Sequence, residues 1–188
     1  DLFNANQRPA IDVGISVSRV GGSAQIKAMK KVSGTLKIGL AQYRDMEAFA
    51  MFASDLDAAS RRQLDRGARL VELLRQPQYS PYPVAEQVIS VWAGTTGKFD
   101  EVPVADVLGY EREFLDYLKH NTKVLETVAE TGDFNADTQQ ATEEALELFK
   151  KQWVGSNGAP LATGDQAAAA LPDEEMDHEQ IVVKRKRS

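Results

Sequence analysis

The sequence predicts a mainly α-helical chain, in which one β-strand leads into a bundle of helices and a disordered extension follows. Three observations support this fold class. Apolar residues alternate at every second position near the N-terminus, they recur at helical spacing through the middle of the chain, and large apolar side chains nearly vanish near the end. We therefore divide the chain into residues 1–22, 23–153 and 154–188.

The first predicted element is a strand over residues 11–18, where apolar and small or polar side chains alternate. Its apolar positions are Ile11, Val13, Ile15 and Val17. Gly21 and Gly22 break the alternation, and we expect the Ser23 hydroxyl to cap the helix that follows. Arg19 therefore lies just beyond the end of the strand.

The middle of the chain predicts a bundle of helices. Helical periodicity covers residues 36–52, 64–74, 84–93, 104–131 and 141–149. Prolines in the QPQYSPYP segment end the second helix, because proline lacks an amide donor and restricts the preceding residue. The longest periodic stretch ends at Thr131-Gly132-Asp133.

Composition excludes several classes of function. The 22 basic and 28 acidic residues give a net charge of -6, which does not favour broad nucleic-acid binding. The absence of cysteine excludes disulfides, thiolate metal sites and cysteine nucleophiles. No apolar run approaches the roughly 20 residues that cross a bilayer, so we expect membrane association only through partners. Because the chain opens at Asp1 without a methionine, we expect it to be a C-terminal fragment.

Common catalytic motifs do not occur. The GxxxxGK[ST] loop that cradles phosphates is absent, and Gly94–Phe99 reads as a turn between helices, so autonomous NTP hydrolysis is not expected. His120 and His178 lack metal-ligand spacing, and no metal site is predicted. Arg19 remains, and by pattern alone it is either a solvated strand-end arginine or a guanidinium aimed at another surface.

Residues 8–60, which contain the string VGISVSRVGG, closely resemble alpha subunits of F-type ATP synthases. The resemblance continues through RGARLVELLRQPQYSPYPVAEQVISVWAG and more weakly to Gln152. It implies that residues 1–22 are the last strand and turn of a truncated α/β nucleotide-binding domain, and that 23–153 are the helical C-terminal domain. The extension from 154 to 188 is similar to those of actinobacterial alpha subunits.

The family resemblance implies a role for Arg19. Alpha subunits alternate with beta subunits in a ring, where proton flow turns a central shaft and drives ATP formation at the beta-subunit sites. The alpha subunit itself binds nucleotide without turning it over. Arg19 matches the arginine finger that reaches the neighbouring beta-subunit site, where a planar guanidinium can contact several phosphoryl oxygens at fixed geometry.

The resemblance also implies two sets of binding residues. Those at the base end of the non-catalytic nucleotide site are Phe3, Arg8, Pro9, Gln76 and Gln78. The complete subunit would hold ATP or ADP with magnesium, whereas we expect no tight binding to this fragment. The residues expected to face the shaft are Ser54, Asp55 and Asp57. Each set has a simpler alternative: a helix-ending loop for the first and helix capping for the second.

The family also implies partners and a location. The expected partners are beta subunits, the central-shaft gamma subunit and the peripheral-stalk delta subunit, with no nucleic acid. The expected location is peripheral, on the cytoplasmic face of a bacterial plasma membrane. In the extension, acidic residues 173–179 precede basic residues 184–187. We hypothesise that this extension contacts the shaft or a neighbouring subunit and restrains ATP hydrolysis.

Two other interpretations remain open. The chain could be a helical interaction module without a catalytic role, descended from an alpha subunit that lost its nucleotide domain. It could also belong to a related rotary or secretion ATPase subunit. The ASDLD loop and the QPQYSP string favour the alpha subunit over the latter.

Overall fold

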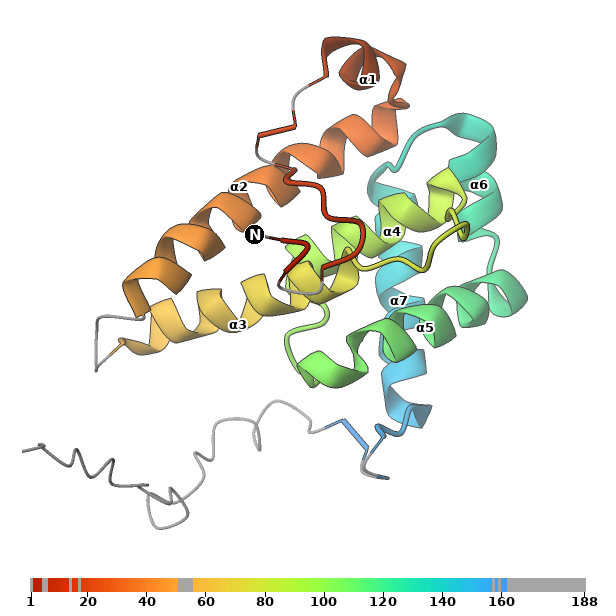
Figure 1. The fold of residues 1–188 in the computed structure, drawn as a ribbon. Coiled ribbons are helices and arrows are strands. Elements are labelled where there is room, and N and C mark those ends of the chain that lie inside the picture. Colours follow the sequence, from red (N-terminus) through yellow and green to blue (C-terminus); the bar gives the residue numbers. More distant parts are fainter. Residues whose placement is uncertain are drawn as a thin grey trace, which may run out of the picture.

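The structure is a computed structural model that describes residues 2–4, 7–13, 15, 16, 18–50, 56–156, 158, 160 and 161. Within these residues the chain forms seven α-helices and one short 3-10 helix, η1 (Figure 1). Their bounds are α1 Arg19–Ala24, α2 Lys27–Ala50, α3 Ala58–Leu73, α4 Val84–Thr95, η1 Val104–Asp106, α5 Val107–Asn121, α6 Val124–Thr131 and α7 Ala136–Gln152. The predicted mainly helical fold is confirmed.

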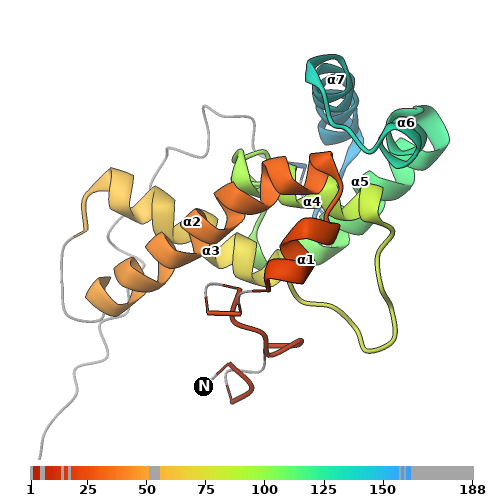
Figure 2. The ribbon, with the colours of Figure 1, turned by 90° about the horizontal axis from the view of Figure 1, so that it is seen from above.

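Helices α2 and α3 run antiparallel to one another, and α4 packs against both (Figures 1 and 2). Helix α2 buries one stripe, because its core residues recur about one turn apart: Ala28, Val32, Leu36 and Leu40. Helix α4 is buried on most of its surface, as expected for the helix that lies between α2 and α3 on one side and α6 on the other.

A second part of the core forms around Tyr110 on α5. The Tyr110 ring is fully buried and meets the rings of Phe99, Phe149 and Trp153 edge to face, with centroids 5.3, 5.1 and 4.9 Å away. Such edge-to-face contacts suit the charge distribution of aromatic rings. They join α5 to the end of α7 and to the turn after α4.

Close contact between α2 and α3 depends on Gly67. A Cβ atom at this position would lie 2.2 Å from Cδ2 of the Tyr43 ring and 2.5 Å from its Cβ. Only glycine therefore permits this separation of the two helices.

The predicted strand over residues 11–18 is wrong for the residues described there. They form turns and irregular backbone, and the bridging found in the described part of the chain is one isolated antiparallel bridge between Val154 and Pro160. The physical reason is that a strand needs a neighbour for its backbone donors and acceptors, and no described segment supplies one. Val13 instead packs against the helical core.

The predicted start of the first helix is also wrong. Ser18, rather than Ser23, is the N-cap: its Oγ accepts a hydrogen bond from the Gly21 amide at 2.9 Å. The two glycines therefore lie inside α1, and Ser23 Oγ donates to the Arg19 carbonyl at 3.0 Å.

The stretch predicted as one helix over 104–131 is divided. It contains η1, α5 and α6, with Thr122 in an extended conformation between α5 and α6. Thr122 Oγ1 donates to the Leu118 carbonyl at 2.8 Å and accepts from the Val124 amide at 3.3 Å. The side chain thus satisfies backbone groups on both sides of the break. The Gly94–Phe99 segment is confirmed as the end of α4 and a turn, with Gly97 at φ 78°.

Candidate functional site

Arg19 is the first residue of α1, and it is exposed. Within the described residues its guanidinium makes no hydrogen bond or ion pair. The Ser18 cap fixes the direction of the backbone at this point. The side chain is therefore available to a group outside the described part of the chain.

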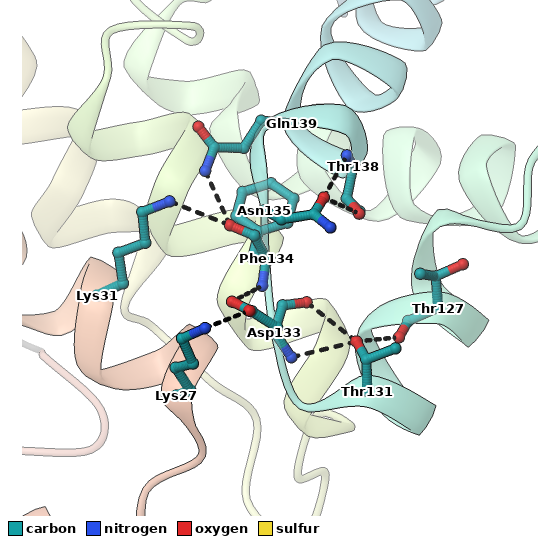
Figure 3. Close-up of polar contacts among 9 residues, drawn as sticks. All are labelled: Lys27, Lys31, Thr127, Thr131, Asp133, Phe134, Asn135, Thr138 and Gln139. Carbon is teal, nitrogen blue, oxygen red and sulfur yellow. Dashed lines mark hydrogen bonds and ion pairs between the residues drawn. The ribbon is translucent and has the colours of Figure 1, made fainter.

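Helix α1 joins α2 through Gln25 and Ile26, and the first turn of α2 is anchored to the turn between α6 and α7 (Figure 3). Lys27 Nζ lies 2.5 Å from Asp133 Oδ2, and Lys31 Nζ donates to the Phe134 carbonyl at 3.1 Å. The Ala28 amide donates to the Gly132 carbonyl at 2.9 Å. The segment that carries Arg19 is thus held at the α2 end by three separate contacts.

Phe134 lies at the centre of this anchor. Its side chain is fully buried, and its ring meets Trp92 of α4 edge to face at 5.3 Å between centroids. Its carbonyl also accepts from Gln139 Nε2 at 2.9 Å, while Asn135 Oδ1 caps α7 by accepting from the Thr138 amide at 2.9 Å (Figure 3). Sequence reasoning missed this cluster, although an asparagine at a helix start, with Asp137 in the first turn, is a recognisable capping signal.

Part of the predicted base-end set is brought together. The Arg8 guanidinium carbon lies 3.6 Å from the centre of the Phe3 ring, and Arg8 Nη1 donates to the Phe3 carbonyl at 2.9 Å. The backbone amide of Gln76 donates to the backbone carbonyl of Arg8 at 2.9 Å, although the two residues are far apart in sequence. Pro9 directly follows Arg8 and is exposed.

Gln78 is the member of this set that the structure does not join to the others. It is exposed in the turn after α3, and within the described residues it makes no hydrogen bond or ring contact with the other four.

The N-terminal segment itself runs across α2 and α3 (Figures 1 and 2) and is attached to α2 by an ion pair between Asp12 and Arg44.

Of the residues predicted to face the shaft, Ser54 and Asp55 lie outside the described residues. Asp57 is described, and it is the N-cap of α3: its Oδ1 accepts from the Ser60 amide at 2.6 Å. This hydrogen bond holds the pKa of Asp57 below its usual value. The capping role is therefore confirmed for Asp57, and contact with a shaft stays a prediction.

The described residues also limit other kinds of site. They contain no group of three or more His, Cys, Asp or Glu side chains placed to hold a metal ion. Among the helices in the described ranges, none is both long and apolar enough to span a lipid bilayer.

Residues 25–149 match the protein family described as ATP synthase alpha/beta chain, C terminal domain, and the chain belongs to this family. The chain is 64% identical to the ATP synthase subunit alpha of Cutibacterium acnes, over 99% of the chain and 34% of the relative. It is 66% identical to that of Bifidobacterium adolescentis, over 86% of the chain and 30% of the relative.

For the ATP synthase subunit alpha of Renibacterium salmoninarum the identity is 61%, over 100% of the chain and 34% of the relative. The chain thus spans about a third of the length of the curated relatives it matches, and the matched part is C-terminal. The resemblance seen in the sequence is confirmed at the level of the alpha subunit and its actinobacterial relatives.

Proposed function

We propose that the chain forms the C-terminal part of an F-type ATP synthase alpha subunit, a non-catalytic subunit of the enzyme that makes ATP from ADP and phosphate with a transmembrane proton gradient. The observation that supports this proposal best is identity of 60% or more, along nearly the whole chain, to relatives named ATP synthase subunit alpha. Their other two thirds would supply what this chain lacks, above all a phosphate-binding loop.

Within that subunit, Arg19 acts in trans as an arginine finger at the adjacent beta-subunit site. Its exposure at the start of α1 and its lack of a partner within the described residues support this role. A guanidinium paired inside its own subunit would have to break that pair before reaching a phosphate. The anchored first turn of α2 limits how far the short α1 can move.

The non-catalytic nucleotide is held at its base end by the set that includes Phe3, Arg8 and Gln76. Support comes from the stacking of Arg8 on Phe3 and from the backbone bond between Arg8 and Gln76. Arginine and aromatic faces are suitable surfaces for a base, and glutamine amides can both donate to and accept from its edge. The phosphates of ATP or ADP, with magnesium, would be held by other parts of the subunit.

The partners in this proposal are beta, gamma and delta subunits, at the cytoplasmic face of a bacterial plasma membrane. The loop that contains Ser54, Asp55 and Asp57 faces the gamma shaft. The extension from 154 to 188 restrains ATP hydrolysis by contact with the shaft or a neighbour. Deleting residues 154–188 is expected to raise hydrolysis by the assembled enzyme, and unchanged hydrolysis would contradict this part of the proposal.

The central test is Arg19→Lys in the assembled enzyme. Lysine keeps the charge but loses the planar fork, and arginine fingers contribute about 10³-fold or more to turnover. We therefore expect a large fall in kcat for both synthesis and hydrolysis, with nucleotide binding changed far less. The matched control is Arg61→Lys, which changes an exposed arginine on α3.

Steady-state kinetics and nucleotide titrations on both variants measure this outcome. Equal turnover for Arg19→Lys and the unmodified enzyme would contradict the arginine finger. It would instead favour the other candidate, a helical interaction module that contributes no catalytic group.

A further inference from the structure

A groove of about 350 Å³ lies along the line where α2 meets α3, and it extends to the end of α4. Its apolar lining includes Ile38 and Gly39 of α2 and Leu70 of α3. Ile38 is 61% exposed, so its side chain presents apolar surface to the solvent at the groove. A segment that covers this surface gains the free energy of removing it from water.

The charge of the groove is positive. Two arginines of α3, Arg62 and Arg66, line it, and no Asp or Glu belongs to its lining among the described residues. Asp100 accepts from Nε and Nη2 of Arg66, which leaves Nη1 as a donor without a partner in the described ranges. Arg62 is exposed and forms no hydrogen bond or ion pair with any described residue. Each guanidinium can therefore donate to a carboxylate of a bound segment.

The end of α7 lies close to this part of the fold. Lys150, in the last turn of α7, pairs at 3.1 Å with Glu101, which is next to Asp100. Leu161, the last described residue, packs against the helical core. From Leu161 to the start of acidic residues 173–179 the chain advances 12 residues, which can span up to about 40 Å. A domain of this size has a radius of gyration of only about 15 Å, so the groove is within reach.

Residues 173–179, with the sequence DEEMDHE, match the groove in both charge and apolar content. Five of these seven side chains are carboxylates, and Met176 stands at the centre. A methionine side chain is unbranched and fits irregular apolar surfaces. The basic residues 184–187 are a poor match, because the arginines of the groove would repel them.

We propose that residues 173–179 dock in this groove of their own chain. Their carboxylates accept hydrogen bonds from Arg62 and Arg66, and Met176 packs against Ile38. A short tether gives a local concentration on the order of millimolar, so even weak contacts keep the segment bound. An acidic segment of another subunit would have the same chemistry without this tether.

This contact is internal to the subunit and needs neither the arginine finger nor the nucleotide site of the proposed function. The restraint on hydrolysis proposed above requires instead that the extension contact the shaft or a neighbouring subunit. The partner found in a cross-linking experiment therefore distinguishes the two proposals.

The test replaces Met176 with the photoreactive amino acid p-benzoylphenylalanine in the whole alpha subunit of the assembled enzyme. After irradiation, mass spectrometry identifies the cross-linked peptides. Cross-links should concentrate on residues 35–42 and 59–70, in a product that runs as a single alpha subunit on a denaturing gel.

Two exposed positions of α3 provide a matched pair of variants. Arg62→Glu reverses a charge in the groove and should lower the cross-linking yield about fivefold, because it replaces one exposed ion pair by a repulsion. Arg61→Glu makes the same change at the adjacent residue, which is not part of the groove lining, and should lower the yield far less. Ile38→Gln tests the apolar contact separately and should also lower the yield, and its exposed position leaves the core unchanged.

Three results would each overturn the proposal. They are cross-links mainly to beta, gamma or delta subunits, cross-links scattered over the alpha subunit, and equal losses of yield for Arg61→Glu and Arg62→Glu. None of these measurements depends on the rate of ATP hydrolysis, so the result stands whether or not the extension restrains the enzyme.

Discussion

Lys27 and Asp133, which are 106 residues apart, form an ion pair of 2.5 Å between the first residue of α2 and the turn that follows α6. The Lys27 side chain is 79% exposed, so water and salt screen this pair strongly. Next to it, Phe134 is fully buried against Trp92. The pair is therefore expected to contribute little to stability, and burial of Phe134 is expected to contribute more at this junction.

Removing the ion pair is expected to change stability only slightly. Asp133→Asn should lower Tm by a small amount at low ionic strength, and the difference should vanish near about 1 M salt, where the screening length is about 3 Å. Lys27 lowers the pKa of Asp133, so the contribution of the pair is present above the pKa of the unfolded chain and is lost as pH falls through the lower folded-state pKa. Thermal unfolding at several pH values measures this, and a large, salt-independent loss would contradict it.

Removing the Phe134 ring is expected to be far more damaging. Phe134→Ala should lower the free energy of unfolding by about 3–5 kcal/mol, the usual cost of deleting a buried phenylalanine side chain. Phe134→Leu is the milder comparison, because it keeps most of the volume and loses the edge-to-face contact with Trp92. Urea unfolding of both variants tests this, and equal losses would show that the ring itself contributes little.

Two glycines, Gly67 and Gly34, provide a matched pair of substitutions to alanine. Gly67→Ala places a methyl group against the Tyr43 side chain and should destabilise the chain by about 1–3 kcal/mol, as overpacking does. Gly34 is exposed on α2, and a methyl group there meets no atom within 4 Å. Gly34→Ala should therefore stabilise by about 0.5–1 kcal/mol, because it lowers the entropy cost of the helix. Chemical denaturation of the two variants should give effects of opposite sign.

Glu111 is expected to make stability depend on pH. Its folded-state pKa is about 7, raised from a reference value of 4.5, so the folded chain holds this proton more tightly than the unfolded chain. Stability is thus highest with Glu111 protonated and is lost progressively as pH rises from about 4.5 to about 7, by up to about 3 kcal/mol.

Glu111→Gln removes this titration. The variant should gain stability relative to the unmodified chain between about pH 5 and about pH 8. Glu113→Gln, on the exposed side of the same helix, should show no such gain. A constant difference between Glu111→Gln and the unmodified chain across this range would place the pKa of Glu111 near its usual value.

The helical part of the fold follows from sequence because each long helix buries a stripe of regular period. The stripe on α2 and the proline-rich end of α3 are local signals. The break at Thr122 was missed, because no glycine or proline marks it and the side chain of an ordinary threonine satisfies the backbone there. The strand over 11–18 was predicted from alternation alone, which cannot reveal whether a pairing neighbour exists.

In the candidate sites, too, local features could be predicted from the sequence and contacts between distant residues could not. The capping role of Asp57 is local and was anticipated. The structure joins Phe3, Arg8 and Gln76 of the set that the family resemblance implies, and their role at a nucleotide base stays a prediction. Contacts such as that of Lys31 with the Phe134 carbonyl were missed, because they join ordinary surface residues across long separations. The burial of Glu111 was also missed, although its spacing from Val107, Phe114 and Leu115 places it on the buried face of α5.

Gly132, which ends α6 with φ 64°, turns its carbonyl toward the Ala28 amide at the start of α2. That amide belongs to the first turn of a helix, where donors have no partner within the helix itself. Opening of either segment therefore exposes a group in the other, and the two should unfold as one cooperative unit. The amide of Ala28 should accordingly exchange with deuterium at the rate of the α6–α7 turn, much more slowly than amides in the exposed α1.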